Sequence, residues 1–311
     1  MREPEGRKTP EALYELTPEA DEVPHGLPLV AGLTGFADAG AAVQQLTEYF
    51  AETSSPVPVA VFDNDELLDY RARRPVIEFV EDHLASYTAA RLVLSLAHDE
   101  IGRPFLLLSG YEPDFQWNRF AAAVLGLIDR FGVTSTTWVQ AIPMPVPHTR
   151  PMQVTVGGTR QDLIDSMSAW RPTTRAPSNV LHLVEWRLAE LGREVAEFVL
   201  LVPHYLADTE LPAAASKALE AVSAATGLLF PVDAIRDRSR DFLARVDEQV
   251  GGNEELASLV RTLEQRHDAY MAGNPVRSPL TDDEGEVPSA DELAAELEKF
   301  LAFRRSTDDE A

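Results

Sequence analysis

The chain has 311 residues, 45% of them hydrophobic, which is enough to bury one sizeable core and a small second subdomain. Its formal net charge of −24 repels nucleic acid and anionic lipid, because both are bound through phosphate neutralisation by Lys and Arg. The absence of cysteine excludes disulfides, thiolate nucleophiles and cysteine-ligated metal sites. We therefore expect no nucleic-acid partner and no membrane association. We also expect no bound cofactor, because the only lysines are Lys8, Lys217 and Lys299 and none lies in the predicted α/β core to bind nucleotide phosphates.

The predicted location is cytoplasmic. Residues 1–22 are polar and rich in Glu and Pro, without the apolar run of a signal peptide. No segment approaches the roughly 18 apolar residues needed to cross a bilayer. The lack of cysteine also fits a reducing compartment.

In chain order, the first predicted unit is an apolar strand at 27–35, a glycine-rich turn and an Ala-rich helix at 39–50. Further strands are predicted at 57–62, 91–97 and 104–109, and the last two lie too close together to be separated by a helix. They indicate a hairpin or a pair of strands in a mixed sheet. Later in the chain we expect a helix at 112–130, strands at 133–142 and 152–156, a helix at 181–191 and a strand at 196–202. This alternation predicts an open, mainly parallel α/β sheet covered on both faces.

From residue 211 onward only helical periodicity remains, at 213–226, 232–250 and 254–272. Residues 273–288 are rich in Pro, Gly, Asp and Glu, and an amphipathic helix is predicted at 290–303. The expected organisation is a polar N-terminal segment (1–22), an α/β domain (23–210), a helical extension (211–272) and an acidic, partly disordered tail (273–311).

Five short segments carry a family resemblance. The turn Gly32–Ala42 resembles the first signature of the proteasome assembly chaperone 2 (PAC2) family, and the other four segments, at 67–75, 110–117, 146–151 and 202–206, follow in the family's order. The last is similar to the bacterial branch found in actinobacteria, whose function is unknown. The resemblance implies a phosphorylase/hydrolase-like α/β core followed by helices. Eukaryotic relatives act as chaperones in proteasome assembly.

Polar residues at the predicted strand ends are the candidates for a pocket. Asp38 stands where a helix N-cap is expected, so a capped turn is favoured over an anion site. Glu112 precedes the expected helix-starting Pro113, which would aim it away from the core. Trp117 falls on the apolar face of that helix, and a core position is favoured over a stacking platform.

The loop Pro147–Pro151 is the most suggestive segment, because flanking prolines stiffen a stretch that holds His148, Thr149 and Arg150. Arg150 is suited either to an anionic ligand or to a structural carboxylate. His204 follows a strand, and a hydrogen-bonded boundary histidine is the favoured interpretation. No metal-binding or nucleophile motif is present in the sequence.

Two functions follow. The first is a non-catalytic binding or assembly factor that works as a homo-oligomer, through the α/β surface or the helical extension. The second is a small-molecule hydrolase or phosphorylase-like enzyme, in which Glu112, His148 and Arg150 converge near Asp38 at the strand ends. The two differ in geometry, because the enzyme requires these side chains to face one pocket. A protein partner or self-association is expected in the first case and a small-molecule ligand in the second.

Overall fold

The structure is a computed structural model that describes residues 9–171 and 173–272. Its centre is an eight-stranded sheet with the strand order β1-β3-β6-β7-β2-β8-β10-β9. In chain order the strands are β1 (Tyr14–Leu16), β2 (Leu29–Thr34), β3 (Val57–Phe62), β6 (Leu92–His98), β7 (Pro104–Tyr111), β8 (Ser135–Met144), β9 (Val154–Gly158) and β10 (Glu194–Pro203).

The sheet is parallel in its centre and antiparallel on both sides. Strands β7, β2, β8 and β10 run parallel, whereas β1, β3, β6 and β9 join through antiparallel pairs. The expected α/β fold is confirmed, and β6 and β7 form the antiparallel pair that their short separation indicates. The carboxyl ends of the four parallel strands lie at one edge of the sheet.

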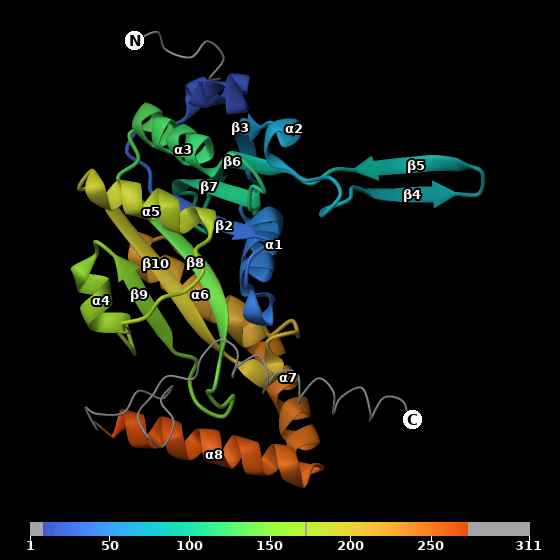
Figure 1. Ribbon diagram of the computed structural model, residues 1–311, viewed down its shortest axis with the longest axis vertical. Helices are drawn as coiled ribbons and strands as arrows, with labels where there is room; N and C mark the ends of the chain where they lie inside the picture. Colours follow the sequence, from blue (N-terminus) through green and yellow to red (C-terminus); the bar gives the residue numbers. More distant parts are fainter. Residues whose placement is uncertain (1–8, 172, 273–311) are drawn as a thin grey trace.

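Helices cover both faces of the sheet (Figure 1). Helices α1 (Ala42–Thr53) and α6 (Pro212–Thr226) pack on one face, and α3 (Trp117–Phe131) and α5 (Val180–Glu190) on the other. Alternate residues of β2 serve the two layers, since Val30 faces the first cluster and Leu29 and Ala31 the second. Shorter elements complete the body, namely α2 (Asn64–Leu67), α4 (Gln161–Met167) and the 3₁₀ turns Pro10–Leu13, Pro18–Glu22, Ala39–Ala41 and His204–Leu206.

The helical extension continues the core instead of forming a separate one. Helices α7 (Asp233–Gly251) and α8 (Glu254–Met271) bring Ile235, Val246, Val260 and Leu263 into the same apolar cluster as α1 and α6. In Figure 1, α8 crosses below the sheet. The predicted helix at 290–303 and the acidic tail lie outside the described residues. Within 9–171 and 173–272, no helix has both the length and the apolar character needed to cross a membrane.

Several features differ from the sequence prediction, which did not include β1, α2 and α4. Helix α3 begins at Trp117 and not at residue 112, because β7 extends to Tyr111 and a loop follows. Residues 76–88, for which no element was predicted, form a hairpin of β4 (Val76–Val80) and β5 (His83–Thr88). The two strands pair only with each other and project from the body (Figure 1).

Candidate functional site

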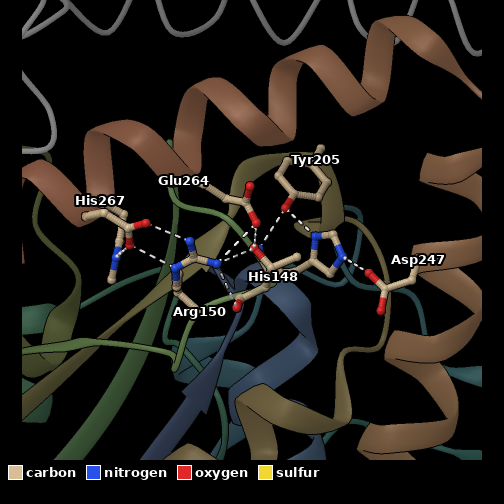
Figure 2. Close-up of polar contacts among 8 residues, drawn as sticks. His148, Arg150, Tyr205, Asp247, Glu264 and His267 are labelled. Carbon is tan, nitrogen blue, oxygen red and sulfur yellow. Dashed lines mark hydrogen bonds and ion pairs between the residues drawn. The ribbon is translucent and has the colours of Figure 1, made fainter.

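The loop after β8 holds His148 against both the core and helix α7 (Figure 2). The backbone N–H of His148 donates to the Tyr205 hydroxyl oxygen at 2.7 Å, and the His148 Nδ1 lies 2.6 Å from the same oxygen. Its Nε2 lies 3.0 Å from Asp247 Oδ1. A carboxylate only accepts hydrogen bonds, so Nε2 carries the proton and the Tyr205 hydroxyl donates to Nδ1. This chain of bonds fixes the imidazole between the core and α7.

Arg150 and Thr149 of the same loop are bound to helix α8, and Figure 2 shows Arg150 beside Glu264 of that helix. The Arg150 Nε and Nη2 donate to the two carboxylate oxygens of Asp268 at 2.8 and 2.6 Å, a bidentate pair. The Arg150 Nη1 reaches Glu264 Oε1 at 3.1 Å, and the Thr149 hydroxyl donates to the same oxygen at 2.6 Å. Hydrogen bonding to Arg150 lowers the pKa of Asp268 to about 2. The side chains of Thr149 and Arg150, which suggested a ligand site, are therefore bound to carboxylates of α8.

Glu112 is buried, and the prediction that it points away from the core is wrong. Glu112 directly follows β7 and is only 8% exposed. Its Oε1 accepts a hydrogen bond from the backbone N–H of Val180 at 2.7 Å. Burial raises the pKa of Glu112. The following loop is fixed by Arg73, which donates to the Glu112 carbonyl and pairs with Asp114 at 3.1 Å. Because this loop and not a helix follows Glu112, its carboxylate can turn inward to α5.

A glycine makes room for that arrangement. Gly35 has φ 127° and lies so close to Arg73 that a Cβ there would stand 2.5 Å from the guanidinium Nη2. The conformation and the contact both exclude an ordinary side chain. The glycine-rich turn therefore serves the packing of Arg73 as well as the entry to α1.

The Asp38 carboxylate binds the first turn of helix α1, although the N-cap residue of that helix is Ala41 and not Asp38 as expected. Its Oδ1 accepts the N–H of Val43 at 2.8 Å and its Oδ2 the N–H of Gln44 at 3.0 Å, so the groups that would bind an anion are already bonded. Burial raises the pKa of Asp38.

Trp117 and His204 also have structural contacts. The Trp117 indole packs against the core on the α3 side and donates to the Pro113 carbonyl at 2.7 Å. The His204 Nδ1 lies 3.3 Å from the Met144 carbonyl oxygen.

The candidate residues all follow carboxyl ends of the parallel strands, yet their contacts divide them between different helices. Among the described residues, no hydrogen bond or ion pair joins Glu112 to His148 or Arg150. Glu112 contacts α5, whereas His148 and Arg150 contact α7 and α8. The common catalytic pocket that the enzymatic interpretation requires is therefore not formed by these contacts.

A second polar cluster, which the sequence analysis did not predict, lies under α5. Gln140 of β8 donates to Glu197 of β10, and His182 Nε2 lies 3.2 Å from the same Glu197 oxygen. Glu185 accepts the indole N–H of Trp138 at 2.7 Å, and burial raises the pKa of Glu185 to about 7. The signal for this cluster was a long polar side chain inside each of two predicted strands, Gln140 in 133–142 and Glu197 in 196–202.

The same cluster approaches a glycine of the edge strand. A Cβ on Gly157 of β9 would stand 2.8 Å from Glu197 Oε2 and 3.7 Å from Glu185 Oε1, so both carboxylates lie over that backbone. Among residues 9–171 and 173–272, no group of His, Asp and Glu has the arrangement of a metal site. The cluster can hold and exchange a proton, since Glu185 titrates near neutral pH.

Known structures share this fold. A protein of unknown function from Corynebacterium glutamicum matches with a TM-score of 0.80 and 33% identity, over 83% of this chain and 98% of that chain. A protein of unknown function from Mycobacterium tuberculosis matches with a TM-score of 0.78 and 38% identity, over 88% and 96% of the two chains. A second M. tuberculosis protein, described as a proteasome-assembly chaperone homologue, has a TM-score of 0.68 and 22% identity, over 75% of this chain and 100% of that chain.

The structural matches agree with the PAC2 resemblance found in the sequence. At 22% identity the chaperone homologue shares the fold alone, whereas the two proteins of unknown function are related in sequence as well. No curated protein matches the chain. The sequence pattern of the PAC2 family matches residues 32–250, which is most of the chain and includes the turn with Asp38, the His148 loop and α7. The chain belongs to the PAC2 family.

Proposed function

We propose that this protein is a non-catalytic assembly factor that works as a homo-oligomer, held together through the β4–β5 hairpin. We call residues Val76–Thr88 the arm. The observation that carries the proposal is an apolar face of the arm that nothing in the described chain covers. A protein whose conspicuous surface is an uncovered apolar ribbon is suited to bind other proteins.

The arm has one entirely apolar face. Ile77 stands opposite Tyr87 and Phe79 opposite Leu84, and residues opposite each other in an antiparallel pair share a face. These side chains are 52%, 63%, 62% and 58% exposed in that order. The other face is mixed, since it carries Glu78 and Ser86 beside Val76 and Val80.

The occupant that we assign to this face is a second copy of the chain. A two-stranded hairpin without a core is at best marginally stable in water, so the arm needs a covering surface whenever the protein is folded. Another copy is the partner that is always present at the same concentration. Its own arm offers the same apolar face, and two such faces can pack across a two-fold axis.

Two observations support the assembly role, namely the similarity to a chaperone homologue and the contacts of the residues at the strand ends. One relative by fold is described as a proteasome-assembly chaperone homologue, and we extend an assembly role of that kind to this chain. Two of the residues that favoured an enzyme have structural contacts, because the Asp38 carboxylate binds the first turn of α1 and Arg150 is paired with Asp268. A cytoplasmic location is part of the same proposal.

The test compares two double variants of the full chain by sedimentation velocity. Ile77→Thr with Phe79→Thr removes apolar area from the proposed contact face while keeping residues that favour strands. Val76→Thr with Val80→Thr makes the same kind of change on the opposite face of β4. We expect the wild type and the Val76/Val80 variant to form the same oligomer, and the Ile77/Phe79 variant to associate about 100-fold more weakly.

Circular dichroism and the thermal midpoint verify that both variants are folded. A wild type that is monomeric at micromolar concentration would overturn the proposal. So would a folded Ile77/Phe79 variant that associates as tightly as the wild type.

A further inference from the structure

A cavity of about 190 Å³ lies where the His148 loop, the end of β10, the start of α6 and helices α7 and α8 meet. Its wall is mainly apolar, and the side chains that close it from four elements are Met152, Leu201, Leu211, Ala213 and Leu243. A cavity of about 150 Å³ lined by apolar side chains accommodates benzene. The space therefore fits a ring of that size with one small substituent.

One polar group of the wall has an unmet hydrogen-bonding need. His267 of α8 lines the cavity and is only 9% exposed, and its Nε2 is buried with no partner among the described residues. Its Nδ1 lies 3.4 Å from Asp268 Oδ1, and because a carboxylate only accepts, Nδ1 carries the proton. When the ring is neutral, Nε2 is therefore an acceptor without a donor, which is an unfavourable state for a buried nitrogen.

The charges around the cavity exclude an anionic ligand. Arg150 is the cation of the wall, and its guanidinium already binds Asp268 through two nitrogens and Glu264 through the third. With these carboxylates and Asp247 beside the loop, the surroundings are negative. A ligand that fits is therefore uncharged, with an apolar body and one hydrogen-bond donor.

We propose that this cavity binds a small uncharged molecule whose apolar body fills it and whose single O–H or N–H group donates to His267 Nε2. Neighbouring atoms cover Nε2, so the ring must turn slightly to meet the donor. The long bond to Asp268 is the one hydrogen bond that holds the ring among the described residues, and it permits that turn. The ligand would bridge the sheet and the helical extension, because the lining residues come from both.

Phenol and anisole are matched probes, since both carry the same ring and only phenol carries a donor. Binding to the full chain is followed by ligand-observed NMR titration. We expect phenol to bind about fivefold more tightly than anisole, the difference that one hydrogen bond makes.

Two variants separate the parts of the site. His267→Phe removes the acceptor and keeps a ring, so phenol should fall to the affinity of anisole while anisole is unchanged. Ala213→Leu narrows the cavity and should weaken both probes by about tenfold. Both variants count as folded if their circular dichroism spectra and thermal midpoints are close to those of the wild type.

The proposal is overturned if neither probe binds the wild type, or if phenol keeps its advantage in the folded His267→Phe protein. Binding that Ala213→Leu leaves unchanged would also place the probes elsewhere. These outcomes are independent of the arm, because the oligomer is measured separately and the cavity residues lie on other elements.

Discussion

Glu185 shows how the sheet and α5 keep an acid partly protonated. Its carboxylate lies under the helix, accepts the indole N–H of Trp138 and stands near the charge of Glu197. Burial is the largest cause that raises its pKa to about 7, and repulsion from Glu197 adds to it. The ionised form is thus less favourable in the folded protein than in the unfolded chain.

The first prediction concerns the pH dependence of the substitution Glu185→Gln. Below about pH 4.5 the carboxyl is protonated in both states, and between about pH 4.5 and 7 only the unfolded chain ionises freely, so the wild type loses stability as pH rises. Glutamine imitates the protonated acid. We expect the variant to match the wild type at pH 4 and to exceed it by about 1–3 kcal/mol at pH 8.

Urea unfolding across this pH range measures the effect. Glu190→Gln, at an exposed position of the same helix, is the matched control. A difference between Glu185→Gln and wild type that stays constant from pH 4 to pH 8 would contradict the account.

For single residues, the sequence predicted roles that depend on near neighbours in the chain better than contacts with distant residues. The bonds of Asp38 to the first turn of α1 and the packing of Trp117 against the core follow from local pattern, because each depends on residues a few places away. The partners of Arg150 lie more than a hundred residues along the chain, so the sequence left a ligand and a structural carboxylate equally open. Glu112 was misplaced because the length of β7 depends on its pairing with β2 and β6.

At the scale of elements, α8 is attached to the rest of the described chain through the His148 loop and through Tyr270, whose hydroxyl donates to the Ala169 carbonyl. Arg150 and Thr149 reach Glu264 and Asp268 on successive turns of the helix, and Leu263 and Val260 pack beneath. Asp268 has a folded pKa of about 2, below its ordinary value. The stabilisation from this pair is therefore complete above about pH 4 and is lost as pH falls toward 2.

The second prediction is that Arg150→Gln loosens α8 without unfolding the sheet. Amide hydrogen exchange in residues 254–271 should accelerate, while exchange in β8 and β10 stays near the wild-type rate. In the wild type, α8 should also open progressively between pH 4 and pH 2, and Asp268→Asn should flatten that dependence. Arg261→Gln, on the exposed face of the same helix, is the control.

Equal acceleration in α8, β8 and β10 would show that the loop stabilises the whole fold and not α8 alone. An unchanged α8 in Arg150→Gln would show that the helix is held without the Arg150 contacts, and would contradict the prediction.

The elements found from the sequence are those whose pattern reflects a buried face. Strands β2, β3, β6, β7, β8 and β10 are apolar runs because the sheet is covered, and α6 to α8 show helical periodicity because one side is packed. The arm gave no such signal. Its apolar residues Ile77, Phe79, Leu84 and Tyr87 share a face that no core of the described chain covers, and a covering partner would explain them.

For the whole molecule, charge and the apolar arm act in opposite directions. A net charge of −24 makes copies of the chain repel one another at a distance, whereas the arm attracts at contact. The contact face contains no charged residue, because its members are Ile77, Phe79, Leu84 and Tyr87. Salt therefore weakens the repulsion without weakening the contact.

The third prediction follows from this opposition. The screening length falls from about 30 Å at 0.01 M salt to about 8 Å at 0.15 M, so repulsion between copies weakens over that range. We expect self-association, measured by sedimentation equilibrium, to tighten about tenfold between 0.01 and 0.15 M NaCl. The Ile77→Thr/Phe79→Thr variant should stay weakly associated at both concentrations, because screening cannot supply the missing apolar contact. Association that weakens with salt would instead indicate an interface held by ion pairs, and would place it away from the arm.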